Sequence, residues 1–225
     1  MTGPTGATDE FTGFPEEALD FYEGLEADNT KAYWTEHKVG YERSVRAPLL
    51  ALCAVLEGEF GPAKVFRPYR DVRFSADKSP YKTTQGALLP GPDGGQVWYL
   101  QISAAGLLVA TGYHEMASDQ VQRFRDAVDD ETTGELLVAL LADLQESGYE
   151  VEGDRLKTRP RGTDPDHPRL DLLRLRTLTA MRRFGPEPWL HTAEVVEVVA
   201  RTWRELAPLD AWLARNVGPS RAPRR

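Results

Sequence analysis

Apolar residues recur at helical spacing through the first quarter of the chain and predict helices over about residues 15–27, after residue 28, and from residue 41 to residue 60. Pro15, followed by two glutamates, favours the N-terminus of the first helix. Asp28 or Asn29 can cap the second helix. Pro48 interrupts the third stretch, which is therefore either two helices or one kinked helix.

The pattern becomes strand-like near residue 64. Short apolar pieces lie at Val65–Phe66 and Val72–Phe74, and two longer runs follow at Val97–Ser103 and Leu107–Tyr113. The two longer runs are apolar, with aromatic and β-branched residues, and they flank a short turn that contains a glycine. We therefore predict a β-hairpin at this point of the chain.

The second half of the chain is predicted to hold further helices beginning at Ser118 and over 133–147, 170–175 and 192–206, strands over 149–156 and 178–184, and loops over 90–95 and 160–168. The last helix can continue to Leu213, past Pro208. This order of elements predicts an α+β fold: a single domain around an antiparallel sheet, with helices at the N-terminus, in the middle and at the C-terminus. We place the domain over 13–217, between a disordered segment of residues 1–12 and a disordered basic tail of residues 218–225.

Composition narrows the class of protein. The chain has 225 residues and a net charge of −8, which argues against a general nucleic-acid coat protein. Cys53 is the only cysteine, so no internal disulfide can form, and a reducing cytoplasm is the expected location. Neither a signal peptide nor an apolar run of membrane-spanning length is present, and we expect no contact with a membrane. The histidines and carboxylates show no metal-binding spacing, so neither a metal nor another cofactor is predicted.

The most chemically loaded stretch of the sequence is residues 64–82, here called the first basic segment. It contains six cations and two anions, a net charge of +4 on a chain of net charge −8. Guanidinium groups bind phosphate or carboxylate through paired hydrogen bonds, and lysines act on phosphate as point charges. The sequence therefore predicts a site for a small anionic ligand, with these candidate ligand-binding residues: Arg67, Arg73, Lys78 and Lys82.

The alternation of a strand divides the first basic segment into two faces. If residues 65–74 form a strand, Arg70 shares the apolar face with Phe66, whereas Arg67 and Arg73 lie on the polar face. A charge on the apolar face needs a partner, because an unpaired buried charge is very costly. We therefore assign Arg70 a structural role, with Asp77 as one candidate partner.

The spacing Arg67-x-x-Arg70-Asp71-x-Arg73-Phe74-x-x-Asp77-Lys78-x-x-Tyr81-Lys82 resembles the signature of domain-of-unknown-function family 2461, which comprises conserved hypothetical bacterial proteins of similar length. The resemblance extends across nearly the whole chain. Asn29 with Trp34 matches an early segment of the family, whereas Thr35 departs from an aromatic residue that is common there. The resemblance implies the length, the one-domain organisation and the signature, but no reaction.

A second basic segment, residues 155–183, contains nine cations and three anions, a net charge of +6. Two basic segments on one small domain would repel each other unless a ligand or carboxylates lie between them. We predict that they face each other across a cleft, to which the second segment would contribute His167, Arg169 and Arg174.

The candidates for a residue that moves a proton are Asp71, Asp77, Tyr81 and His114. Of these, His114 follows a predicted strand, where a histidine can act as a general base. Two alternatives to small-ligand binding remain open. The two basic segments would together follow a nucleic-acid backbone, or the first would be only a salt-bridge scaffold in a structural or partner-binding domain. The sequence specifies neither a reaction nor an oligomeric state.

Overall fold

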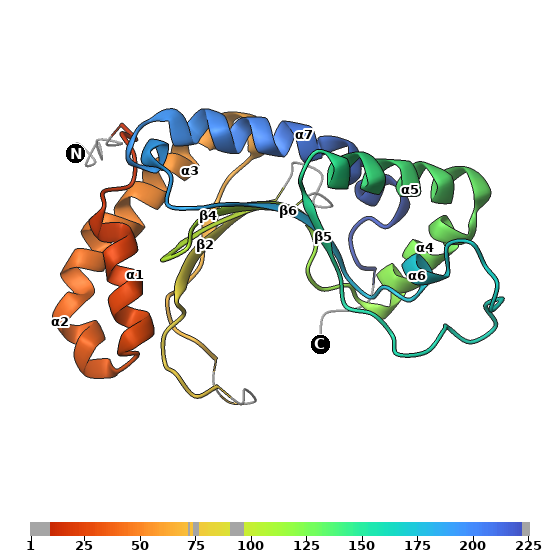
Figure 1. The fold of residues 1–225 in the computed structure, drawn as a ribbon, viewed down its shortest axis with the longest axis horizontal. Coiled ribbons are helices and arrows are strands. Elements are labelled where there is room, and N and C mark those ends of the chain that lie inside the picture. Colours follow the sequence, from red (N-terminus) through yellow and green to blue (C-terminus); the bar gives the residue numbers. More distant parts are fainter. Residues whose placement is uncertain (1–9, 72, 74–76, 91–96, 222–225) are drawn as a thin grey trace, which may run out of the picture. The chain divides into compact units, whose positions relative to one another are not determined.

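The computed structural model describes residues 10–71, 73, 77–90 and 97–221. Six strands form one sheet in the order β1-β2-β3-β4-β6-β5 (Figure 1). Helices precede the strands, interrupt them and end the chain, so the predicted α+β class with an antiparallel sheet is confirmed. Several predictions fall partly outside the described residues: the strand piece at Val72–Phe74, the loop at 90–95, and the two chain ends.

The chain separates into two units, which we describe in turn. The first unit contains Met1–Leu89, Tyr99–Leu108 and Arg183–Ala200, and the second contains Pro90–Trp98, Val109–Arg182 and Arg201–Arg225.

The first unit begins with two helices, α1 (Glu17–Ala27) and α2 (Lys31–Tyr41), which lie side by side in Figure 1. The hydroxyl of Thr30 caps α2 by accepting a hydrogen bond from the N–H of Tyr33 at 3.2 Å. The prediction of Asp28 or Asn29 as the cap was therefore wrong. The side chain of Asn29 bonds to another part of the first unit instead.

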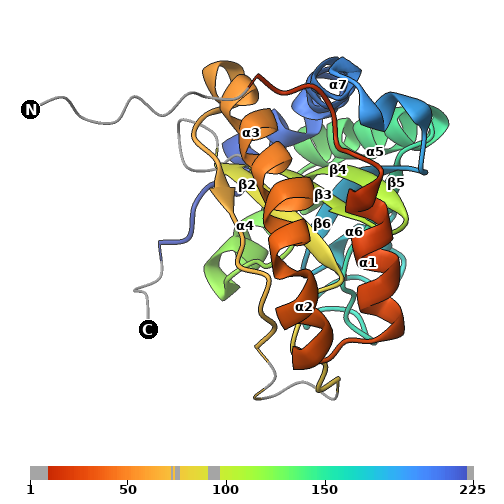
Figure 2. The same cartoon turned by 90° about the vertical axis from the view of Figure 1, so that its left-hand side faces the viewer.

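No break occurs at Pro48. A π-helical turn, η1 (Glu42–Arg46), joins α2 to α3 (Ala47–Phe60), and the helices form a nearly continuous rod (Figure 2). Within this turn the N–H of Ala47 donates to the carbonyl of Glu42, five residues back. Pro48 has no N–H and cannot donate to the carbonyl four residues before it, which accounts for the wider turn at this point.

The strands that follow belong to the first unit up to Leu89 and from Tyr99 to Leu108. β1 (Lys64–Val65) pairs antiparallel with β2 (Thr84–Pro90). The predicted hairpin is confirmed as β3 (Val97–Ser103) and β4 (Gly106–Tyr113). Gly106 makes the turn between them with a φ of 93°, a conformation that glycine adopts without strain. The core also reaches further toward the N-terminus than predicted, because Phe11 is buried against Phe14.

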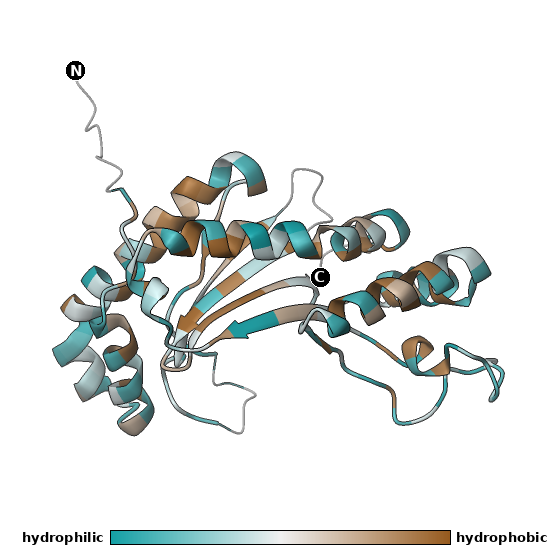
Figure 3. Ribbon diagram, turned by 45° about the horizontal axis from the view of Figure 1, so that its top comes forward, coloured by the Kyte–Doolittle hydropathy of each residue, from teal (hydrophilic) through white to brown (hydrophobic). Residues whose placement is uncertain are grey.

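The second unit is built from the later helices and strands: α4 (Ser118–Asp129), α5 (Glu131–Glu146), β5 (Glu150–Glu152), α6 (Leu170–Leu173) and most of β6 (Leu178–Phe184). The strand predicted over 149–156 is shorter than expected, with an isolated bridge from Arg155 to Leu175 beyond it. A short helix, η2 (Pro188–His191), and the start of α7 belong to the first unit. Figure 3 shows hydrophobic and hydrophilic residues alternating along α7 (Glu194–Asn216), which continues past Pro208 as predicted.

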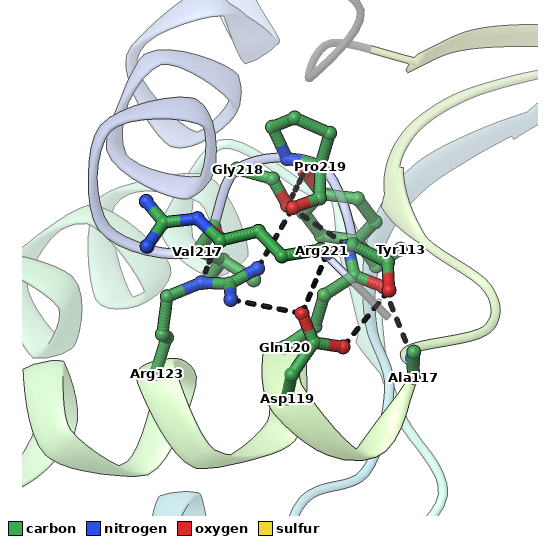
Figure 4. A network of polar contacts seen from close by, with 10 residues as sticks. Tyr113, Ala117, Asp119, Gln120, Arg123, Val217, Gly218, Pro219 and Arg221 are labelled. Carbon is green, nitrogen blue, oxygen red and sulfur yellow. Dashed lines mark hydrogen bonds and ion pairs between the residues drawn. The ribbon is translucent and has the colours of Figure 1, made fainter. Parts of the chain in front are cut away.

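A polar network holds the segment that follows α7 (Figure 4). The guanidinium of Arg123, on α4, donates to the carbonyls of Val217 and Pro219. The carboxylate of Asp119 accepts from the N–H of Arg221 and from the hydroxyl of Ser220. These contacts, led by the Arg221 N–H, hold the pKa of Asp119 well below its usual range. The segment up to Arg221 is thus fixed against α4, although we predicted a disordered tail from residue 218.

Candidate functional site

The first basic segment begins with a change of strand register. The N–H of Phe66 donates to the carbonyl of Gly86, continuing the β1–β2 ladder, but three residues later Tyr69 pairs with Tyr81. The chain therefore advances three residues from Phe66 to Tyr69 but five residues from Tyr81 to Gly86. The two extra residues form a bulge within 82–85. Of the expected strand over 65–74, the described residues form only the end of β1 and one isolated bridge at Tyr69.

Gln85 stabilises this change of register. Its buried side-chain amide donates to the carbonyl of Phe66 at 2.7 Å, and its oxygen accepts a hydrogen bond from the hydroxyl of Tyr41. The side chain thus replaces backbone pairing that the bulge removes, and it leaves no orphaned carbonyl at Phe66. Buried glutamines are uncommon. The only signal in the sequence was the polar side chain itself, and no neighbouring residue indicated its hydrogen-bond partners.

Beyond the bulge, three aromatic rings make a rigid platform. Tyr69 and Tyr81 form a non-hydrogen-bonded antiparallel pair, the geometry that brings side chains closest, and their ring centroids lie 5.6 Å apart. Trp34, from α2, stacks on Tyr81 at 4.4 Å with an interplanar angle of 9°. Asn29 fixes the backbone of Tyr81 on both sides, donating to its carbonyl at 3.0 Å and accepting from its N–H at 3.1 Å.

The tyrosines of this platform differ in exposure. Tyr81 is buried, and burial raises the pKa of its phenol, which therefore stays protonated and keeps its capacity to donate. Tyr69 is 47% exposed. The alternation of the segment places Tyr69 on the polar face, but the sequence did not single it out as a site residue.

Both aspartates of the segment are paired with arginines. Asp71 accepts from Nε of Arg73 at 3.0 Å and from Nη2 at 2.6 Å, and Asp77 forms an ion pair with Arg70. Exposure alternates as expected for the two faces: 28% of the Arg70 side chain is accessible, against 76% for Arg73. Arg70 is nevertheless not in the core. It is half-buried beside an exposed aspartate, so the expected burial on an apolar face was wrong.

The other cations of the segment lie outside these two pairs. Lys64, Arg67 and Lys78 are exposed. Arg67 lies close enough to Asp71 to lower the pKa of that carboxyl, although it forms no ion pair among the described residues. The half-buried Lys82 places its ammonium 5.3 Å from the ring centroid of Phe66. Positive charge therefore exceeds negative charge along this segment, and several of its cations are exposed.

The aspartate titrations test this arrangement in solution. The Arg73 side chain lowers the pKa of Asp71, and the Ser79 backbone N–H, with Arg70 as a smaller contributor, lowers that of Asp77. Because both values are depressed in the folded protein, the contribution to stability is present above the ordinary pKa and is lost as the pH falls through the depressed values.

We expect a carbon-13 NMR titration of the two carboxyl groups to give midpoints below 3.8. Arg73→Gln should return Asp71 toward that value, whereas Arg70→Gln should move Asp77 less, because the Ser79 contact persists. An Asp71 midpoint that ignores Arg73→Gln would contradict the ion pair.

The candidate residues of the second basic segment bond to structural elements of the second unit. Arg169 donates to the carbonyls of Val128 and Asp129, at the C-terminal end of α4. His167 accepts from the N–H of Arg169 and lies 3.3 Å from a carboxylate oxygen of Asp129. Arg174 donates to two backbone carbonyls near residue 156. Apart from Arg183, the second basic segment belongs to the second unit, whereas the first belongs to the first unit, and the shared cleft stays a prediction.

His114 lies directly after β4, as its position in the sequence predicted. It lines a polar cavity of about 500 Å³ in the second unit, together with Glu152, Gly153, Asp154, Arg155, Thr177 and Thr179. Within the described part of the chain, no group of three or more His, Cys, Asp or Glu side chains is arranged to hold a metal ion.

The chain matches the model of a known protein family. A family model described as "Conserved hypothetical protein (DUF2461)" matches residues 17–212, which is most of the chain. A search of curated proteins found no match. Among the described residues, no helix has both the length and the apolar character needed to cross a membrane.

Proposed function

The chain belongs to the DUF2461 family of conserved hypothetical proteins, and we propose that its first basic segment binds the phosphate or carboxylate group of a small anionic ligand. The observation that carries this proposal is the excess of exposed positive charge over residues 64–82. Within these residues the six cations exceed the two anions, Asp71 and Asp77, by four charges. On a chain of net charge −8, such an excess attracts anions to one place on the surface.

Local rigidity supports the same proposal. Asp71 holds the Arg73 guanidinium through two hydrogen bonds while most of that side chain remains in solvent. The backbone that carries Arg67 and Lys82 is fixed by the Tyr69–Tyr81 bridge and by the bulge. A preorganised guanidinium loses less conformational entropy when it binds an anion. In this proposal Arg67, Arg73 and Lys78 contact the anion, and Lys82 adds to the local field.

Thermal unfolding in the presence of anions tests the proposal. At about 100 times its Kd, a bound ligand stabilises the folded state by about 2.7 kcal/mol, which corresponds to a rise in Tm of about 5–10 °C for a chain of this size. The panel would contain inorganic phosphate, sugar phosphates, nucleotides and dicarboxylates. We expect Arg67→Gln combined with Arg73→Gln to reduce the shift. Arg43→Gln, which removes an exposed cation from η1, is the matched control and should leave it unchanged.

Two results would contradict the anion-binding proposal. If every anion of the panel leaves the melting curve unmoved, or if Arg43→Gln reduces the shift as much as the double variant does, the segment is not a specific anion site. The two ion pairs favour a second candidate role, in which the segment is a salt-bridge scaffold. In that case Arg70→Gln should alter the unfolding curve while no anion does.

A further inference from the structure

Tyr69 is an exposed aromatic residue within the first basic segment. Nearly half of the residue, 47%, is accessible to solvent, although the ring is held in place. It packs at tilted angles against Trp34, with centroids 6.1 Å apart, and against Tyr81, with centroids 5.6 Å apart. Both of these neighbours are buried. The ring is therefore fixed along its inner side and open to solvent elsewhere.

The charges around Tyr69 come from its neighbours in the sequence. Arg67 and Asp71 lie two positions on either side of Tyr69, Arg73 follows, and all of these residues are exposed. Arg73 donates to the carboxylate of Asp71 from Nε and Nη2, and Arg67 lies close enough to lower the pKa of the same carboxyl. Two guanidinium groups therefore lie near the carboxylate that follows the exposed aromatic ring by two positions.

The chemistry of these residues matches a ligand with two parts. Guanidinium groups bind phosphate oxygens, and an exposed aromatic ring stacks on a planar base. We propose that the ligand of the first basic segment carries a nucleobase together with its phosphate, with the base on Tyr69 and the phosphate on Arg67 and Arg73. This inference rests on the proposed anion-binding function and specifies its ligand class.

A phosphate joined to a base has two sources, a free mononucleotide and a single-stranded nucleic acid. Stacking on Tyr69 serves both, because every base has an aromatic face. The two sources differ in their response to salt. A single strand that contacts several phosphates loses affinity more steeply with increasing salt concentration than a mononucleotide does.

The test compares ligands that share one part and differ in the other. Isothermal calorimetry would measure the affinities of AMP, ribose 5-phosphate, adenosine and a ten-residue oligothymidylate at two salt concentrations. We expect AMP to bind about tenfold more tightly than ribose 5-phosphate, in line with the contribution of one stacked base. Tyr69→Leu should abolish this difference, and Tyr69→Phe, which keeps the ring, should preserve it. Tighter and more salt-dependent binding of the oligonucleotide would identify a single strand as the source.

The outcomes distinguish a failure of the nucleobase inference from a failure of the anion-binding function. If ribose 5-phosphate binds the unaltered protein as tightly as AMP, the nucleobase inference is overturned and the anion-binding function stands. If none of the four ligands binds and inorganic phosphate and the dicarboxylates also fail, the anion-binding function itself fails. The comparison of AMP with ribose 5-phosphate needs no variant, so the inference remains testable even if Tyr69→Leu does not fold.

Discussion

Trp34→Ala is expected to lower the free energy of unfolding by about 3–5 kcal/mol, the usual cost of removing a large buried aromatic side chain. Trp34 is buried between α2 and the first basic segment, where it stacks on Tyr81. Its ring centroid lies 4.8 Å from that of Tyr41. Its loss would leave a cavity beneath the aromatic platform and would loosen the backbone that carries Arg67. We therefore expect anion binding to weaken together with stability.

Urea-induced unfolding measures the loss of stability. Hydrogen exchange of the Lys82 N–H, which donates to the carbonyl of Pro68, measures the loosening of the backbone. Trp34→Phe is the matched control because it keeps an aromatic ring, and it should lose less stability and retain slow exchange at Lys82. A loss below about 1 kcal/mol for Trp34→Ala would contradict the packing described here.

Gly112→Ala is expected to destabilise the second unit by about 3–5 kcal/mol, from overpacking and from a strained backbone together. Gly112 has a φ of 117°, a conformation that residues with a Cβ rarely adopt. An added methyl group would overlap the carbonyl oxygen of Leu178 and lie 2.9 Å from Cα of Thr179. Both are backbone atoms of β6, so no side-chain movement relieves the clash.

Gly162→Ala separates the two causes. Gly162 also has a positive φ, 87°, but no atom lies within 4 Å of the position that its Cβ would occupy. Gly162→Ala should therefore lower the free energy of unfolding only by the backbone strain, about 1–2 kcal/mol. Thermal or urea-induced unfolding of the two variants gives the difference, which isolates the overlap with β6. Equal losses would show that β4 and β6 separate easily at this point.

Much of the secondary structure follows from local patterns. The hairpin of β3 and β4, the strand β6 and the long helix α7 lie close to their predicted positions, because their apolar residues alternate or recur over many positions. The errors concern places where a single residue was weighed alone. Pro48 suggested either two helices or one kinked helix, but the helix continues through the π-helical turn η1, which accommodates the missing N–H of Pro48.

The sequence by itself determined the charge excess of residues 64–82 and an alternation of exposure along that segment, because both depend on neighbouring residues. It also identified Asp77 as a candidate partner of Arg70. Only the tertiary structure decided that the segment is anchored by Asn29, Trp34 and Gln85. These contacts join residues up to 52 positions apart, as from Asn29 to Tyr81. No local periodicity encodes such a contact, because the register shift that creates it appears only when the strands pair.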